Sequence, residues 1–72
     1  MSQKEKLLAK ILRNPKNVSL NDYESLINCY GYIEEGAKHP KAIIEVYTLP
    51  YKRENPVKSC YVVDLLEIID SL

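Results

Sequence analysis

The sequence predicts a single small α+β domain with helices at both ends and a sheet between them. Apolar residues recur with helical spacing near both ends of the chain, whereas β-branched and aromatic residues gather in the middle. Glycine and proline residues separate these segments. We therefore expect the order α-α-β-β-β-α, with helices packed on one face of a three-stranded antiparallel sheet and residues 1–72 forming one domain.

The size and charge of the chain restrict the kind of site that it can carry. With 72 residues, it should bury only about 60% of the surface that the unfolded chain exposes, so a site has to be open or completed by a partner. Ten basic and ten acidic side chains cancel, and net charge gives no reason to expect nucleic-acid binding. Residues 4–16 and 38–58 are nevertheless basic, whereas the last segment is acidic, so one basic face is expected.

Residues 3–13 are expected to form the first helix. One stripe of this segment is apolar at helical spacing and consists of Leu7, Leu8, Ile11 and Leu12. Asn14 precedes Pro15, and a residue before proline is disfavoured in the helical conformation, so the helix should end there.

The second helix is predicted to begin after Ser19 and to end before Gly31. Ser19 and Asp22 have the spacing of a capping box, with Asp in the position more often taken by Glu. An apolar face follows at helical spacing and consists of Tyr23, Leu26, Ile27 and Tyr30. Gly31 is expected just after the helix, in the left-handed conformation that glycine adopts most readily.

Three short strands are expected between the second helix and residue 50. Residues 32–35 form the first, and residues 42–49 contain enough β-branched and aromatic side chains for two more. The turn between these two should lie near residues 44–46 with Glu45 as its pivot, although no Asn-Gly or Gly-Gly pair is present. Pro50 closes the run, and a residue without an N–H suits the edge of a sheet.

A charged loop, residues 51–56, is expected to lead to the last helix, residues 59–71. Ser59 is the expected cap at the start of this helix. Its core stripe consists of Val62, Leu65, Leu66 and Ile69, and its acidic residues should point outward.

The cysteines and the hydropathy of the chain exclude several classes of protein. Cys29 and Cys60 are too few and too far apart for a disulfide framework or a metal site, and each is expected as a buried thiol. No apolar run approaches the ~18 residues that a membrane span needs, and the first residues lack a hydrophobic signal core. We therefore expect a soluble cytoplasmic protein with no membrane partner.

His39 is the only histidine of the chain, and Lys38 and Lys41 lie close to it in sequence. It is either an ordinary surface histidine or a proton-transfer group, because imidazole can take and give a proton near neutral pH. A metal ligand is less favoured, because no second histidine and no cysteine lies at ligand spacing. We expect neither a metal nor a cofactor.

Four basic residues could form a cationic rim around this histidine: Lys38, Lys41, Lys52 and Arg53. Such a rim suits a phosphodiester, because lysine acts as a point charge and arginine can hold two oxygens at once. RNA supplies its own nucleophile, the 2′-hydroxyl, whereas DNA would need an activated and usually metal-bound water. No acidic cluster suits a metal, since Glu34 and Glu35 are expected as the solvated end of a strand. If the chain cleaves a nucleic acid, RNA is the expected substrate.

Four segments follow one another in an order that is typical of a known family: Tyr30-Gly31-Tyr32, Gly36-Ala37-Lys38-His39, Thr48-Leu49-Pro50-Tyr51-Lys52-Arg53 and the final helix from Tyr61 to Asp70. In this order the chain resembles the HicA toxins, small bacterial and archaeal mRNA interferases of type II toxin–antitoxin systems. The resemblance covers residues 20–72, with Lys38 standing where the family usually has a serine. Residues 1–18 look like an N-terminal helical extension seen in some members.

The resemblance implies a fold similar to the double-stranded RNA-binding domain. It also implies metal-independent cleavage of mRNA by a single catalytic histidine, which is His39 here. A HicB-type antitoxin is the implied protein partner, and it would cover the histidine face. Lys38, Lys41, Lys52 and Arg53 are the residues expected to bind RNA phosphates.

Two other functions are compatible with the same sequence. The basic loops could hold RNA by its shape without cleaving it. Alternatively, the domain could bind a protein through the exposed face of the sheet. Tyr47 and Tyr51 suit either base stacking or packing, and packing is the expected role.

Overall fold

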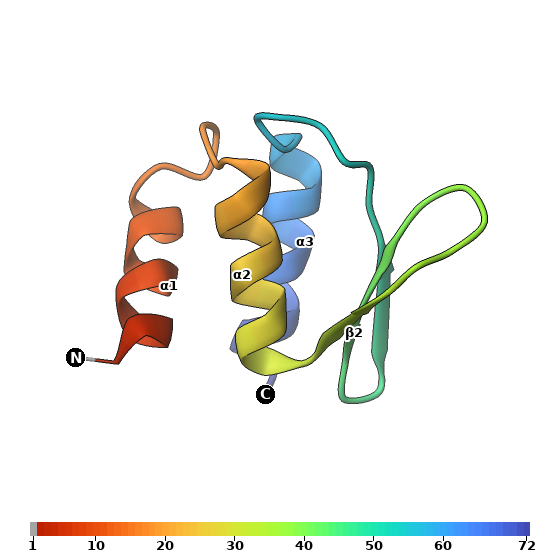
Figure 1. Cartoon of the computed structure of the whole chain (residues 1–72). Helices are drawn as coiled ribbons and strands as arrows, with labels where there is room; N and C mark the ends of the chain where they lie inside the picture. Colours follow the sequence, from red (N-terminus) through yellow and green to blue (C-terminus); the bar gives the residue numbers. More distant parts are fainter. Residues whose placement is uncertain (1) are drawn as a thin grey trace.

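The structure, a computed structural model that describes residues 2–72, has the predicted α+β architecture. Its elements are α1 (Gln3–Arg13), α2 (Leu20–Tyr30), β1 (Tyr32–Glu34), β2 (Lys41–Ile44), β3 (Tyr47–Pro50) and α3 (Ser59–Asp70). The helices stand side by side, and the sheet lies against one side of this helical layer (Figure 1). The expected order α-α-β-β-β-α is confirmed. Within residues 2–72, no helix combines the length and the apolar character that a membrane span requires.

The sheet has the strand order β1-β2-β3 and is antiparallel throughout. In the central strand, Ala42 pairs with Ile33 of β1 and with Leu49 of β3. Successive side chains on a strand point to opposite faces, so Ala42 and Leu49 share the buried face, whereas Lys41 lies on the exposed one. The expected single covered face is thus confirmed. Pro50 lies on β3, which is an edge strand, as predicted.

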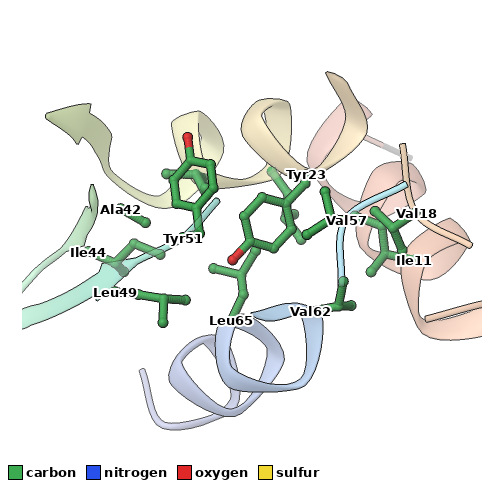
Figure 2. Packing of buried hydrophobic residues seen from close by; sticks show 12 residues of the cluster. Ile11, Val18, Tyr23, Ala42, Ile44, Leu49, Tyr51, Val57, Val62 and Leu65 are labelled. Carbon is green, nitrogen blue, oxygen red and sulfur yellow. The ribbon is translucent and has the colours of Figure 1, made fainter. Parts of the chain in front are cut away.

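Helix α2 is the central element of the core. It contacts α1, α3 and two strands of the sheet, and its side chains Tyr23, Leu26 and Ile27 are fully buried. They belong to one apolar cluster, drawn in Figure 2, whose other members are Ile11, Val18, Ala42, Ile44, Leu49, Tyr51, Val57, Val62 and Leu65. Complete burial of a large apolar side chain contributes about 1.5–3 kcal/mol, so this cluster is the main source of stability.

The connector before α2 and the loop before α3 are joined at one end of the helical layer. The amide of Val57 donates to the carbonyl of Val18 at 2.9 Å, and both valines are buried. The amide of Leu20 donates to Oδ1 of Asn55 at 3.3 Å. These contacts hold the starts of α2 and α3 close together.

The helix starts agree with the sequence at α2 and differ from it at α3. Oγ of Ser19 accepts a hydrogen bond from the amide of Asp22 at 3.2 Å, as a capping box requires. At α3 the expected cap is wrong, because Ser59 is already helical and the N-cap residue is Lys58, whose side chain makes no capping bond. The buried Val57 lies just before this helix, so packing positions its start where capping does not.

Gly31 is required for a different reason from the predicted one. Its φ is −165°, which is extended backbone and not the left-handed conformation. A Cβ at this position would lie 2.0 Å from the carbonyl oxygen of Ile43. Glycine therefore allows the end of α2 to pass directly against β2 before the chain enters β1.

The two expectations that the cysteines are buried are wrong, and one residue of the apolar stripe of α1 is exposed. Cys29 and Cys60 are both exposed. Each lies two residues from a core position of its helix, Ile27 or Val62, which is a rotation of about 200° away from the core. Leu12 is 56% exposed, although its neighbour Ile11 is buried.

The turn between β2 and β3 consists of Glu45 and Val46, as predicted, and generates a stability prediction. Glu45 has a φ of 54°, a conformation that costs a residue with a Cβ about 1 kcal/mol but is open to glycine. Glu45→Gly should therefore raise the free energy of unfolding by about 1 kcal/mol in urea denaturation.

Val46 provides the matched control for this prediction. It is 90% exposed and follows Glu45 in the same turn, and Glu45 is the one non-glycine residue with positive φ among residues 2–72. Val46→Gly should lower the stability or leave it unchanged, because it only adds freedom to the unfolded chain. A Glu45→Gly variant that is less stable than the parent would contradict the turn geometry.

Candidate functional site

His39 lies in the loop of residues 35–40 that joins β1 to β2. The end of this loop is anchored, because Pro40 is buried and its carbonyl accepts a hydrogen bond from the amide of Tyr51 at 3.1 Å. At Gly36 a Cβ would lie 2.4 Å from the carbonyl oxygen of His39, so the loop folds back on itself where only glycine fits. His39 itself is exposed, as expected of a surface or proton-transfer histidine.

A shallow hollow of about 360 Å³ adjoins this histidine. The loop and the segment after β3 provide its wall, which consists of Glu35, Gly36, Lys38, His39, Pro40, Lys52 and Arg53. The structure thus brings together His39, Lys38, Lys52 and Arg53 from the predicted site. It does not bring in Lys41, which is the first residue of β2 and lies on the exposed face of the sheet.

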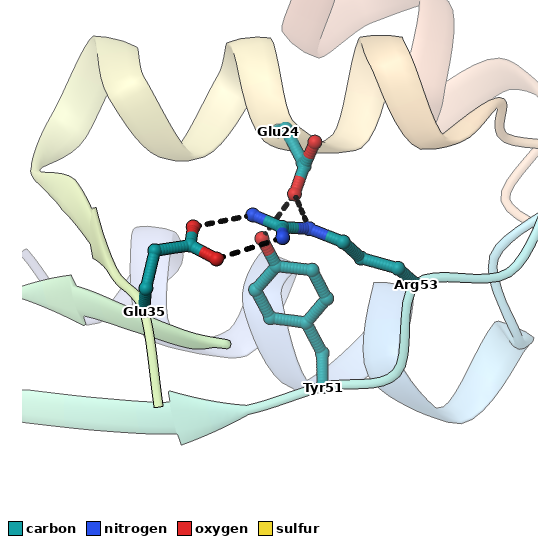
Figure 3. A network of polar contacts seen from close by, with 4 residues as sticks. All are labelled: Glu24, Glu35, Tyr51 and Arg53. Carbon is teal, nitrogen blue, oxygen red and sulfur yellow. Dashed lines mark hydrogen bonds and ion pairs between the residues drawn. The ribbon is translucent and has the colours of Figure 1, made fainter. Parts of the chain in front are cut away.

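Arg53 is held by two carboxylates, as Figure 3 shows. Its Nε donates to Oε2 of Glu24 at 2.9 Å, and NH1 and NH2 donate to Oε1 and Oε2 of Glu35 at 2.8 and 2.6 Å. Glu24 belongs to α2 and Glu35 to the loop after β1, so one side chain links three segments. The hydrogen bonds to Glu35 and Glu24 raise the pKa of Arg53 above its ordinary value. The hydrogen bonds from Arg53 hold the pKa of Glu35 below its ordinary value.

Tyr51 anchors this network in the core. It is 1% exposed, and its ring meets the ring of Tyr23 edge to face with centroids 5.1 Å apart. Its hydroxyl donates to Oε2 of Glu24 at 2.5 Å. Burial raises the pKa of Tyr51 above its ordinary value of 10.0, and the hydrogen bond to Glu24 raises it further. Tyr51 is therefore a packing residue, as expected.

The other cations of the site differ in their surroundings. Nζ of Lys52 lies 3.4 Å from Oε1 of Glu54, which follows it by two residues. Within residues 2–72, neither Lys38 nor Lys41 has an acidic side chain at ion-pair distance. Lys38 is therefore the cation in the hollow whose charge is least compensated.

Reasoning from the sequence missed the two acidic partners of Arg53. Glu35 is exposed and directly follows β1, in agreement with the expected solvated end of a strand, but both of its carboxylate oxygens also bind Arg53. Arg53 lies 29 residues from Glu24 and 18 residues from Glu35 in the chain. No local spacing in the sequence indicates a contact over such separations.

The described part of the chain shows no group of three or more His, Cys, Asp or Glu side chains arranged to hold a metal ion. Comparisons of the chain with models of protein families, with curated proteins and with solved structures found no match. The function therefore has to be argued from the geometry around His39.

The Tyr51 hydroxyl generates a second prediction. Tyr51→Phe removes the hydrogen bond to Glu24 but keeps the buried ring, and a hydrogen bond to a charged group contributes about 1.5–3 kcal/mol. We expect the variant to unfold in urea with a free energy lower by about 1.5 kcal/mol or more at neutral pH. Tyr32→Phe is the control and should change it by less than about 0.5 kcal/mol, because Tyr32 is 57% exposed.

The stability of Tyr51→Phe should also depend on alkaline pH differently from that of the parent. A tyrosine whose pKa is raised on folding contributes stability that is complete below its unfolded pKa, 10.0, and is lost as the pH rises above it. Burial raises the pKa of Tyr23 as well, so the parent has two such groups. Between pH 9 and 11.5, the stability of Tyr51→Phe should therefore fall less steeply than that of the parent. Parallel curves for the two proteins would contradict the assignment.

Proposed function

We propose that this chain is a metal-independent RNA endonuclease in which His39 is the catalytic general acid and base. One observation carries the proposal. The exposed His39 borders a hollow whose wall also presents Lys38, Lys52 and Arg53. An open hollow of this kind suits a polymer chain that passes over the surface.

The chemistry of RNA needs little more than this set of groups. The 2′-hydroxyl attacks the adjacent phosphorus, the bond from phosphorus to the 5′-oxygen breaks, and a 2′,3′-cyclic phosphate and a 5′-hydroxyl result. One proton leaves the 2′-oxygen and one arrives at the 5′-oxygen, and an imidazole can carry out either transfer. In this mechanism His39 takes the proton of the 2′-hydroxyl and then gives a proton to the 5′-oxygen, while Lys38 and Lys52 compensate the negative charge that builds up on the phosphate.

The proposed activity groups the chain with the HicA toxins. The order of elements, a histidine in the loop before β2 and a basic segment after β3 support this grouping. It includes a fold similar to the double-stranded RNA-binding domain, mRNA as the substrate and a location in the cytoplasm. It also includes a HicB-type antitoxin as the partner that covers the histidine face.

The alternative is a non-catalytic module of the same fold that binds RNA or a protein. One observation favours it. Carboxylates balance the charges of Arg53 and Lys52, so little net positive charge remains in the hollow to fix a phosphate for cleavage. Such a module would bind RNA in a salt-dependent way, or a protein partner, and leave RNA intact.

The proposal predicts that His39→Ala abolishes RNA cleavage. Loss of a general acid or base lowers the rate by about 100-fold or more. The purified parent should therefore cleave total bacterial mRNA about 100-fold faster than His39→Ala, or more. The new 3′ ends should carry a cyclic phosphate. Expression of the parent, but not of His39→Ala, should slow bacterial growth.

Lysine variants provide the matched control for this experiment. Lys38→Ala should reduce cleavage, whereas Lys16→Ala, which removes the same charge from the connector between α1 and α2, should not. Cleavage by His39→Ala at the parental rate would refute the catalytic assignment. RNA that binds but stays intact with the parent would favour the non-catalytic module.

A further inference from the structure

The guanidinium of Arg53 binds two glutamates that differ in their exposure to solvent. Nε donates to Glu24, whose side chain is 24% exposed and whose carboxylate also accepts a hydrogen bond from the hydroxyl of the buried Tyr51. NH1 and NH2 donate to the two carboxylate oxygens of Glu35, whose side chain is 65% exposed. Within the described residues, Arg53 is the one side-chain partner of Glu35. One carboxylate is therefore part of the packed structure, and the other closes the network from the solvent side.

The NH1 and NH2 pair has the geometry of an anion site. A guanidinium presents two parallel N–H groups that match two oxygens of a carboxylate or of a phosphate equally well. Glu35 fills this pair with both oxygens, at 2.8 and 2.6 Å. Arg53 and His39 line the same hollow, so a phosphate bound to Arg53 would share that hollow with the imidazole.

We propose that the NH1 and NH2 pair of Arg53 is the phosphate-binding seat of the site and that the carboxylate of Glu35 occupies it in the free protein. A phosphate of RNA has to displace Glu35 before it reaches the seat. Glu35 is thereby a residue that sets affinity and excludes weakly bound anions. This inference rests on the proposed function for the identity of the ligand, an RNA phosphodiester.

Glu24 has a different task in this arrangement. Because it holds Nε and is itself held by the hydroxyl of Tyr51, the guanidinium keeps its orientation when Glu35 leaves. Displacement of Glu35 then exposes a seat that is already oriented. Glu24 is therefore a positioning residue, whereas Glu35 is a substitute for the ligand.

The experiment compares two neighbouring glutamates in a background that cannot cleave. Glu35→Gln and Glu34→Gln are each combined with His39→Ala, and both remove one negative charge. The side chain of Glu34 lies in β1 and, by the alternation along a strand, on the face opposite to that of Ile33, away from the covered face. Binding of a fluorescein-labelled, mixed-sequence 20-nucleotide RNA is measured by anisotropy at low salt.

Glu35→Gln should bind this RNA about fivefold more tightly than His39→Ala alone, and Glu34→Gln should differ from it by less than about twofold. The gain at Glu35 should disappear when Arg53→Gln is added. Equal gains for the two glutamate variants, a gain that survives Arg53→Gln, or no RNA binding by any variant would overturn the inference. A lower melting temperature for Glu35→Gln without tighter binding would also overturn it, because the contact would then be structural only.

The two proposals fail separately. If the parent does not cleave RNA but Glu35→Gln gains affinity through Arg53, the phosphate seat is supported and the catalytic role of His39 is refuted. If His39-dependent cleavage is found but Glu35→Gln gains no affinity, the nuclease activity is supported and the phosphate seat at Arg53 is refuted.

Discussion

The burial of Tyr51 is the contact on which both the core and the site depend. Its ring packs against Tyr23 of α2, its amide holds the carbonyl of Pro40, and its hydroxyl reaches Glu24. One residue therefore fixes the end of β3 against α2 and also anchors the end of the histidine loop. Tyrosine suits this position because its ring fills the core while its hydroxyl gives the partly buried carboxylate of Glu24 a hydrogen-bond donor.

The consequence for the site is that its cations are not equivalent. Arg53 follows Tyr51 by two residues and binds a pair of carboxylates, so two acidic side chains of the protein compensate its charge. Lys38, in the loop between β1 and β2, has no acidic side chain at ion-pair distance within residues 2–72. A phosphate that approaches the hollow would first meet a lysine and would reach the arginine only by replacing a carboxylate.

Most of the fold could be predicted from local patterns, and the failures have a common cause. Ser19 caps α2 through a contact three residues away, and Glu45 turns the hairpin because no better turn residue is near. Gly31 was placed correctly but explained wrongly, since its reason is the carbonyl of Ile43 on another element. The cysteines were assigned by the average burial of their residue type, which the orientation of each helix overrules.

The sequence by itself determined the helices, the strands and the loop that exposes His39, because hydrophobic periodicity and the Ser19 cap act over a few neighbouring residues. It also indicated that Lys38, Lys41, Lys52 and Arg53 could gather near this histidine, and all of them except Lys41 line the same hollow. Only the tertiary structure decided which of these charges is compensated. Glu24 and Glu35 reach Arg53 across 29 and 18 residues of chain, and such contacts depend on how α2, the sheet and the loops pack together.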